Sequence, residues 1–392
     1  MFRSMSLIFG RLGCLLCTAA TLLVGSSAFA DEVDDDLATI ERVGPQATGS
    51  DEARRARDRL LGHGTEILPQ LLGAMDTKNV VAANWGRTVF EEIVARELAK
   101  REPQFPLESL KAYAADAKRQ GRVRRRALAL VDQLDPAFRS KLIPTLLDDP
   151  EFRTDAVDAA LAAGAKAEAA GDRDEAIAKY RLAFEHSRAA DQAILAAAKL
   201  KALGQPADIN AHLGFVVDWL LLGPYDAPQY SGFAKAFPPE EHATIDLDAE
   251  YAGQGGQAIH WRRFRTEDAL GQLNLIDAIA PVKEAVGYAY SELNSPREMD
   301  AELRCGADDN CTVWLNGRRV FGREQWLNGT RLDRFTTPVK LREGRNTLLV
   351  KICQGPQHKD PEVPNNWSLQ LRFCDRTGVG VGLTSALPVE AP

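Results

Sequence analysis

The chain has 392 residues, of which 48 are Lys or Arg and 55 are Asp or Glu, so its formal net charge is −7. This acidic balance argues against nucleic acid as a partner, because binding to phosphate backbones depends on clustered positive charge. The length exceeds that of a usual single domain, so two or more hydrophobic cores are expected.

Residues 1–30 have the layout of a secretory signal peptide. Two arginines accompany an apolar run from Leu12 to Val24, and Ala28-Phe29-Ala30 supplies the small residues of a signal peptidase site. The apolar run is too short to span a bilayer as a helix. The sequence therefore predicts export to the periplasm or the cell exterior, a mature chain that starts at Asp31, and no stable membrane span after cleavage.

Residues 31–150 are rich in Ala, Leu, Arg and Glu at helical spacing. The hexapeptide Ile67-Leu-Pro-Gln-Leu-Leu72 recurs as Leu142-Ile-Pro-Thr-Leu-Leu147, and each copy follows a charged helical stretch. The pattern resembles HEAT or armadillo repeats and predicts an α-solenoid of stacked helix pairs. One dense basic cluster is expected to be a solvated helix face rather than an anion site; it comprises Arg122, Arg124, Arg125 and Arg126.

Residues 151–213 are predicted to form a further helical segment. Asp172 can cap a helix in which Glu175 follows three residues later, and Ala176, Tyr180 and Ala183 then share one face. This spacing resembles the second helix of a tetratricopeptide repeat. Packing is the simpler role for one such unit, and a peptide groove is the alternative.

Residues 214–378 are expected to form an antiparallel β-sandwich, because short alternating runs are separated by Gly and Pro turns. The predicted strands are 258–264, 285–293, 297–305, 311–315, 336–341, 346–353 and 367–374. The fold class is therefore multidomain α + β, a helical repeat region followed by a sandwich. No Gly/Ser linker separates the two parts at 205–214, so a packed junction is expected. Residues 379–392 are expected to be a disordered tail.

The stretch from Cys305 to Phe321 predicts strands around the acidic turn Asp308-Asp309, closed by a tight hairpin at Asn316-Gly317. Four cysteines are disulfide candidates in an exported chain, and burial as free thiols is the equal alternative. They are Cys305, Cys311, Cys353 and Cys374.

Several motifs together resemble a known family of exported planctomycete-type bacterial proteins. The motifs are Gly214-Phe-Val-Val-Asp-Trp219, Leu222-Gly-Pro-Tyr-Asp226, Val313-Trp-Leu-Asn-Gly317, Glu343-Gly-Arg-Asn346 and the segment 367–375. In that family HEAT- or TPR-like helices run directly into a galactose-binding-like jelly roll, which is mostly non-catalytic. The Asp308-Asp309 turn before Trp-Leu-Asn-Gly also resembles PA14 domains, some of which bind sugars through calcium held at paired aspartates.

The candidate ligand-binding residues are Asp308, Asp309, Trp314, Asn316, Trp326 and Trp367. Tryptophan faces stack on sugar rings, and the two aspartates offer the oxygen ligands that Ca²⁺ prefers. Calcium needs six to eight oxygens, so turn capping is the simpler role for the aspartates, and no other cofactor is indicated.

No nucleophile, base and orienting group recur in a catalytic spacing, and the six histidines are scattered. We therefore expect a non-catalytic exported protein whose sandwich binds a glycan or an envelope protein and whose helices mediate protein interaction. The alternative is a polysaccharide-active enzyme, similar to a glycoside hydrolase, with carboxylates in the loops of residues 223–257, such as Asp246, Asp248 and Glu250, or in 354–366.

Overall fold

The computed structural model of the chain describes residues 31–241, 245–326, 329–356, 358–360 and 365–387. The predicted signal peptide, residues 1–30, lies outside these ranges. The chain divides into two compact units, Met1–Ala156 and Val157–Pro392. Within the described ranges, we find no helix with the length and apolar character needed to cross a membrane.

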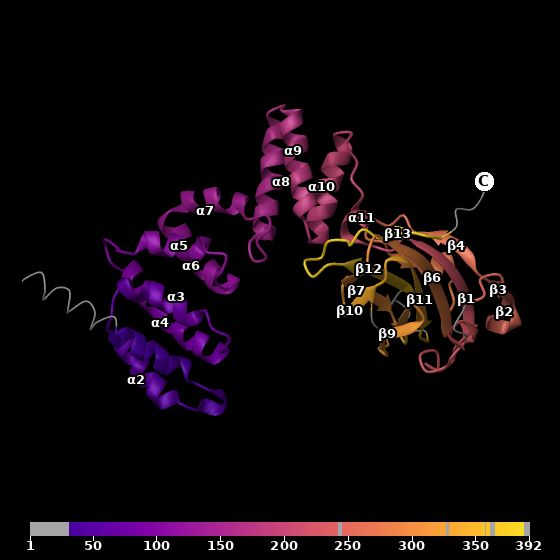
Figure 1. The fold of residues 1–392 in the computed structure, drawn as a ribbon, viewed down its shortest axis with the longest axis horizontal. Helices are drawn as coiled ribbons and strands as arrows, with labels where there is room; N and C mark the ends of the chain where they lie inside the picture. Colours follow the sequence, from indigo (N-terminus) through magenta and orange to yellow (C-terminus); the bar gives the residue numbers. More distant parts are fainter. Residues whose placement is uncertain (1–30, 242–244, 327–328, 357, 361–364, 388–392) are drawn as a thin grey trace, which may run out of the picture. The chain divides into compact units, whose positions relative to one another are not determined.

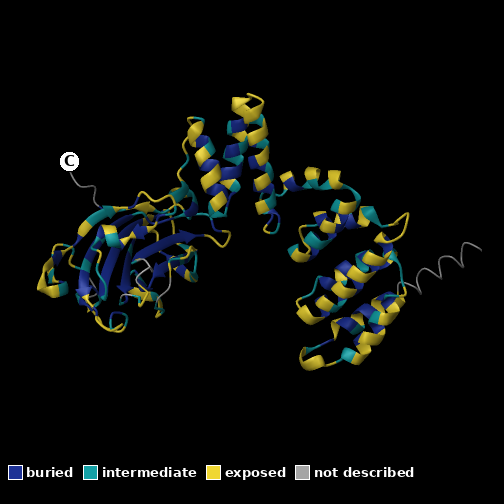
Figure 2. Cartoon of the chain, turned by 180° about the vertical axis from the view of Figure 1, so that it is seen from behind, coloured by how far each residue is buried: buried dark blue, intermediate teal, exposed yellow. Residues whose placement is uncertain are grey.

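The first unit is helical (Figure 1). Residues 31–41 are helical, and the elements that follow are η1 (Pro45–Ala47), α2 (Ser50–Leu60), η2 (Thr65–Ile67), α3 (Leu68–Met75), α4 (Val80–Leu98), α5 (Leu107–Ala115), α6 (Gly121–Leu134), α7 (Pro136–Leu142), η3 (Ile143–Thr145) and the start of α8 (Arg153–Ala169). The helices bury one face and expose the other, as Figure 2 shows. This amphipathic pattern is the one expected for helices that pack on their neighbours.

The two copies of the hexapeptide have different structures. In the first copy, Pro69 occupies the first turn of α3, where a missing N–H costs no hydrogen bond, and the helix continues to Met75. In the second copy, Pro144 lies in the short 3-10 element η3, and the chain then turns toward Asp149. The sequence echo therefore does not correspond to a structural repeat of the helix.

The second unit begins with the rest of α8, followed by α9 (Arg173–His186), α10 (Ala190–Ala202) and α11 (Ile209–Leu213). As predicted, the Asp172 side chain accepts a hydrogen bond from the Glu175 N–H at 3.1 Å and caps α9. The face formed by Ala176, Tyr180 and Ala183 is buried. Figure 1 shows α9 beside both α8 and α10.

The last helices of this unit pack directly on the strands. Ala193, Leu213 and Phe215 form a small buried cluster, and the Arg372 guanidinium donates to the Leu213 carbonyl at 3.0 Å. The junction at 205–214 is thus a packed contact, in agreement with the absence of a flexible linker in the sequence.

Two antiparallel sheets make up the rest of the unit. The larger sheet has seven strands in the order β4 (Arg262–Arg265), β1 (Asp218–Asp226), β6 (Ala285–Ser295), β11 (Gly344–Gln354), β8 (Asn310–Leu315) and β9 (Arg318–Arg323), with β13 (Thr384–Ser385) paired to β6. The smaller sheet has the order β10 (Phe335–Leu341), β7 (Met299–Asp308), β12 (Ser368–Cys374) and β5 (Leu273–Asn274). A separate pair joins β2 (Glu250–Ala252) to β3 (Ala258–His260), and short helical turns lie at α12 (Pro238–Glu241), η4 (Gln254–Gly256) and α13 (Leu275–Ala278).

The two sheets face each other across one apolar core, to which alternate residues of their strands contribute. Val313 and Val350 from the larger sheet and Leu303 and Leu371 from the smaller sheet are all buried there. Figure 2 shows the strands as the most buried part of this unit. A second cluster covers part of the other face of the larger sheet, where Phe237, Ile259 and Trp261 pack with buried side chains of β6 and β11.

The prediction of a disordered tail is wrong for the described residues 379–387. Thr384 and Ser385 pair with β6, and Leu387 is 5% exposed. Gly380 also bridges Cys374, the last residue of β12. The backbone of this segment is therefore fixed by pairing with strand ends, which its Gly-rich composition does not indicate.

Candidate functional site

A groove of about 460 Å³ lies on the outer face of the seven-stranded sheet, the face turned away from the inter-sheet core. Its floor is a row of three side chains from three adjacent strands, because the register places Leu349 opposite both Tyr290 and Trp314. Tyr290 and Leu349 are buried, whereas Trp314 is only half-buried. The indole is thus the part of this row that remains open to a ligand.

One wall of the groove comes from the segment that covers the same sheet face. Pro239, Glu240, Ile245 and Leu247 line this side. An ion pair fixes the wall to the sheet, since the Lys351 ammonium lies 2.8 Å from the Glu240 carboxylate. Buried interiors rarely hold a lysine without such a partner.

Lys351 is 1% exposed and has a complete set of acceptors. Besides Glu240, its ammonium donates to the Lys235 carbonyl at 2.6 Å and to the Phe233 carbonyl at 3.4 Å. The Tyr288 hydroxyl also bonds the Glu240 carboxylate. Burial, followed by the charge of Glu240, raises the pKa of Tyr288, which keeps the phenol a donor.

The opposite end of the groove is polar. Asn316, Arg342, Arg345 and Thr347 line it, and Glu292 lies beneath them. Glu292 accepts a hydrogen bond from the Tyr290 hydroxyl at 2.8 Å and is ion-paired with Arg345. An aromatic platform beside oriented polar groups is the composition of a small-molecule binding site.

The tight hairpin before β9 holds Asn316 at this end. Asn316 and Gly317 have φ values of 53° and 76°, as the Asn-Gly sequence predicts for a two-residue turn. The Asn316 amide oxygen accepts from the Thr347 N–H at 3.0 Å, and its amide nitrogen donates to the Asn346 side chain at 2.9 Å. The turn therefore also fixes the relative position of β8 and β11 at the groove.

The Asp308-Asp309 turn lies elsewhere, at the end of the sheets where β7 passes into β8. Both aspartates are 7% exposed. The Asp309 carboxylate accepts from the Gly355 N–H at 2.9 Å, so it fixes a loop that is distant in the sequence rather than capping its own turn. Burial, followed by the charge of Asp309, raises the pKa of Asp308 to about 7.

Asn310 completes this acidic end with a buried, unsatisfied amide. It is 3% exposed, and neither its oxygen nor its nitrogen has a hydrogen-bond partner among the described residues. With two carboxylates it offers three hard oxygen ligands, the type that calcium prefers. In the part of the chain that the structure describes, no group of three or more His, Cys, Asp or Glu side chains could hold a metal ion.

The remaining predicted tryptophans fall in two different environments. Trp326 packs edge-on against Tyr230 with ring centroids 4.9 Å apart, near Gly355 and therefore near Asp309. Trp367 is fully buried in the inter-sheet core, and its indole N–H donates to the Ile352 carbonyl at 3.4 Å. The predicted binding role of Trp367 is wrong, because a side chain without exposed surface cannot stack on a ligand.

The four cysteines among the described residues are free and buried, so the disulfide alternative is wrong in this structure and the buried-thiol alternative holds. They are Cys305, Cys311, Cys353 and Cys374. The hydrogen bond with Cys305, together with burial, raises the pKa of the Cys311 thiol well above its usual value. Such thiols are poor nucleophiles and pack as small apolar residues.

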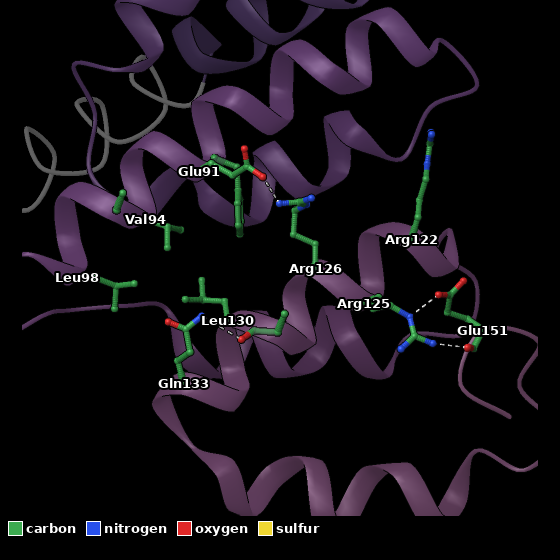
Figure 3. Close-up of a pocket in the computed structure, with 12 residues that line it drawn as sticks. Glu91, Val94, Leu98, Arg122, Arg125, Arg126, Leu130, Gln133 and Glu151 are labelled. Atoms are coloured by element: carbon green, nitrogen blue, oxygen red, sulfur yellow. Dashed lines mark hydrogen bonds and ion pairs between the residues drawn. The ribbon is translucent and has the colours of Figure 1, made fainter. Parts of the chain in front are cut away.

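The first unit has a hollow of its own, of about 540 Å³, between α4 and α6 (Figure 3). Val94, Leu98 and Leu130 lie around it. Arg126 reaches across one end to Glu91, at 2.5 Å. The hollow is therefore apolar inside with an ion pair at its margin.

The basic cluster of α6 is not a solvated face throughout. Arg124 is 2% exposed and forms an ion pair with Asp149 at 2.6 Å. The other Asp149 oxygen accepts from the Glu151 and Phe152 N–H groups and so caps the turn before α8. The prediction is wrong for Arg124, whose role is to hold that turn, whereas Arg125 and Arg126 make ion pairs at the surface.

Sequence reasoning found Trp314 and Asn316 but missed the residues that share their groove. Tyr290, Arg342, Arg345 and Glu240 come from strands or turns far from Trp314 in the chain. Tyr290 lies in the predicted strand 285–293, and Arg345 directly precedes the predicted strand 346–353. A correct pairing of β6, β11 and β8, with β11 extended to Gly344, would have placed both on the same face as Trp314.

No known protein family and no curated protein matches this chain. Among solved structures, it is similar to a GH31 α-xylosidase from Xanthomonas citri, with 17% sequence identity, 30% of this chain and 15% of that chain covered, and a TM-score of 0.19. It is also similar to a β-glucuronidase from Faecalibacterium prausnitzii, with 14% identity, 41% and 31% covered, and a TM-score of 0.17. The chain thus spans less than a third of either enzyme, and likenesses at these TM-scores carry no argument.

Proposed function

We propose that this chain is an exported, non-catalytic binding protein whose two-sheet unit is a jelly roll of the galactose-binding-like type and binds a glycan. The observation that supports this best is the groove with the half-buried Trp314 at its open side and polar side chains at its end. Sugar rings present an apolar face to an indole and hydroxyls to its polar neighbours, which is the combination the groove offers.

The carboxylates of the groove support binding rather than glycoside hydrolysis. Glycosidases need one carboxyl group free to donate a proton and a second free to act as base or nucleophile. Glu240 is ion-paired with Lys351, and Glu292 is ion-paired with Arg345. Both are engaged in fixing the walls. If the chain is instead a polysaccharide-active enzyme, the purified protein should release reducing ends from a polysaccharide, and a reducing-sugar assay would detect them.

A glycan array probed with the full mature chain tests the proposal. Trp314→Ala is expected to abolish binding and Trp314→Tyr to retain part of it, since the phenol still offers a stacking face. Trp85→Ala, which removes a half-buried tryptophan of α4, is the matched control and should bind as the wild type does. Equal binding by Trp314→Ala and the wild type would exclude this groove as the glycan site.

A second candidate site is a calcium-assisted one at the Asp308-Asp309 turn, near Trp326. The buried, unpartnered amide of Asn310 beside two carboxylates favours it, because a cation would satisfy the amide oxygen and offset the repulsion between the aspartates. Calcium should then raise the melting temperature at pH 8 in the wild type but not in Asp308→Asn. Equal melting temperatures with calcium and with EDTA would leave the turn a purely structural element.

We propose that the helices form an α-solenoid of HEAT- and TPR-like units and mediate contact with an envelope protein. The apolar hollow between α4 and α6 is the surface that supports this role (Figure 3). Leu98 is 38% exposed at its margin, and exposed apolar groups beside a hollow are typical of protein contacts. An envelope protein should co-purify with the wild type and with Glu92→Gln, a variant on the same helix. It should not co-purify with Leu98→Glu.

A further inference from the structure

The charges around the sheet groove do not balance. Two of its cations already have carboxylate partners, because Arg345 is paired with Glu292 and Lys351 with Glu240. Arg342 lines the groove and is exposed, and no carboxylate lies within ion-pair distance of its guanidinium among the described residues. The polar end of the groove therefore carries one uncompensated positive charge.

A second arginine adds to this charge beside the indole. Arg319 lies directly opposite Trp314 in the pairing of β8 with β9, so the two side chains share the outer face. Its guanidinium lies 5.8 Å from the centre of the Phe233 ring, and within the described ranges it has no carboxylate partner. The acidic residues Asp246 and Asp248 alternate with Ile245 and Leu247, and only the latter two line the groove.

We propose that the glycan bound in this groove is an anionic one, whose carboxylate or sulfate group pairs with Arg342 while a sugar ring lies against Trp314. This inference rests on the proposed function and specifies its ligand. A guanidinium offers parallel N–H donors that match the oxygens of a carboxylate or sulfate, and such bonds are stronger than those of neutral groups. Arg319 strengthens the same positive field without contacting the groove.

The position of Arg342 fits this role mechanically. Its backbone N–H donates to the Asn346 amide oxygen at 3.0 Å, and its carbonyl accepts from the Asn346 amide nitrogen at 2.8 Å. The backbone of the turn between β10 and β11 is thus fixed by a fully buried side chain, whereas the guanidinium itself is free to meet a ligand. A rigid base lowers the entropy lost on binding.

Titration calorimetry on the full mature chain can test the inference with three oligosaccharides that differ in charge. The probes are a galacturonate trimer, a sulfated galactose trimer and a neutral galactose trimer. At low salt the wild type should bind one of the anionic trimers at least about tenfold more tightly than the neutral one, and the difference should shrink as ionic strength rises. The preferred anionic trimer shows whether Arg342 binds a carboxylate or a sulfate group.

Two variants separate the inference from the function on which it rests. Arg342→Gln should weaken binding of the preferred anionic trimer about five- to tenfold and leave the neutral trimer unchanged. Arg376→Gln, an exposed arginine that follows the smaller sheet, is the control and should change neither. Trp314→Ala should weaken all three trimers.

The outcomes are distinct. Equal affinity for charged and neutral trimers, with no effect of Arg342→Gln, overturns the anionic ligand and leaves glycan binding intact. Absence of binding to every trimer and to a wider glycan array overturns both. A loss on Arg342→Gln that is equal for charged and neutral trimers also refutes the inference, because it would show that the variant disturbs the turn rather than a charge pair.

Discussion

The ion pair between Lys351 and Glu240 allows a quantitative test of how the groove is held together. Lys351→Met should lower the free energy of unfolding of the second unit by about 2–3 kcal/mol, because Glu240, which is 15% exposed, keeps a charge without its partner. Glu240→Leu should cost more, about 3–5 kcal/mol, because it leaves the ammonium of Lys351 at 1% exposure with only two carbonyl acceptors.

The double variant distinguishes a charge pair from two independent losses. Lys351→Met with Glu240→Leu removes both charges of the pair, so neither is left buried alone, and the remaining loss is of the hydrogen bonds to the Tyr288 hydroxyl and to the two carbonyls. Its cost should be about 1–2 kcal/mol, well below the sum of the single variants, which gives a coupling energy of at least about 3 kcal/mol. A large coupling energy is typical of buried ion pairs, because removing both charges also removes their desolvation cost.

Urea unfolding followed by tryptophan fluorescence is the appropriate assay. Five of the six tryptophans lie in the second unit and only Trp85 lies in the first, so the signal reports mainly on the sheets. Additive costs, or a Lys351→Met variant within about 0.5 kcal/mol of the wild type, would refute the view that this pair anchors the groove wall.

Three further predictions concern other parts of the chain. The folded pKa of Asp308 is about 7 and its usual value is 3.8, so protonation of this carboxyl stabilises the folded state; the stabilisation is fully present below pH 3.8 and is lost as pH rises through 7, at about 1.4 kcal/mol per pH unit. Urea unfolding at several pH values should show this loss of stability in the wild type but not in Asp308→Asn, and the same loss in both proteins would refute it. In the first unit, Arg124→Met should cost about 3–5 kcal/mol because Asp149 is left buried and unpaired, whereas Arg126→Met, at an exposed pair, should cost about 1 kcal/mol or less by circular dichroism; equal costs would contradict the distinction. Gly214→Ala should lower the melting temperature, since φ is 80° and a Cβ would lie 2.1 Å from the Phe373 carbonyl oxygen; an unchanged value would show that the junction yields freely.

The sequence predicts the strands best where local pattern and local chemistry agree. Alternation in β7 and β8, together with the positive φ of Asn316-Gly317, follows from period-two burial and from the turn residues that a tight hairpin needs. The same agreement places α9 and its Asp172 cap. These features depend on neighbours within about ten residues, which a single sequence contains.

Burial of charges and choice of face were not predictable in the same way. Arg124 and Lys351 look like surface residues, and only the approach of Asp149 and Glu240 from distant segments explains their burial. Trp314 and Trp367 are equivalent by composition, but the first points outward from β8 while the second lies in the core beside Gly287. Each difference depends on long-range pairing, which local propensity does not specify.

The position of the groove follows from how unevenly the outer face of the larger sheet is covered. At one end, Gly232 lies so close to Val286 and Cys353 that no further side chain fits, and Phe237 covers the next row. The cover then ends at the Lys351–Glu240 pair, and the following row leaves Trp314 half-buried. A sheet without a ligand to bind would gain stability by extending the apolar cover over that indole, at roughly 25 cal/mol for each Å² removed from water. The half-buried tryptophan beside an exposed arginine is therefore the open surface on which the proposed anionic glycan would lie.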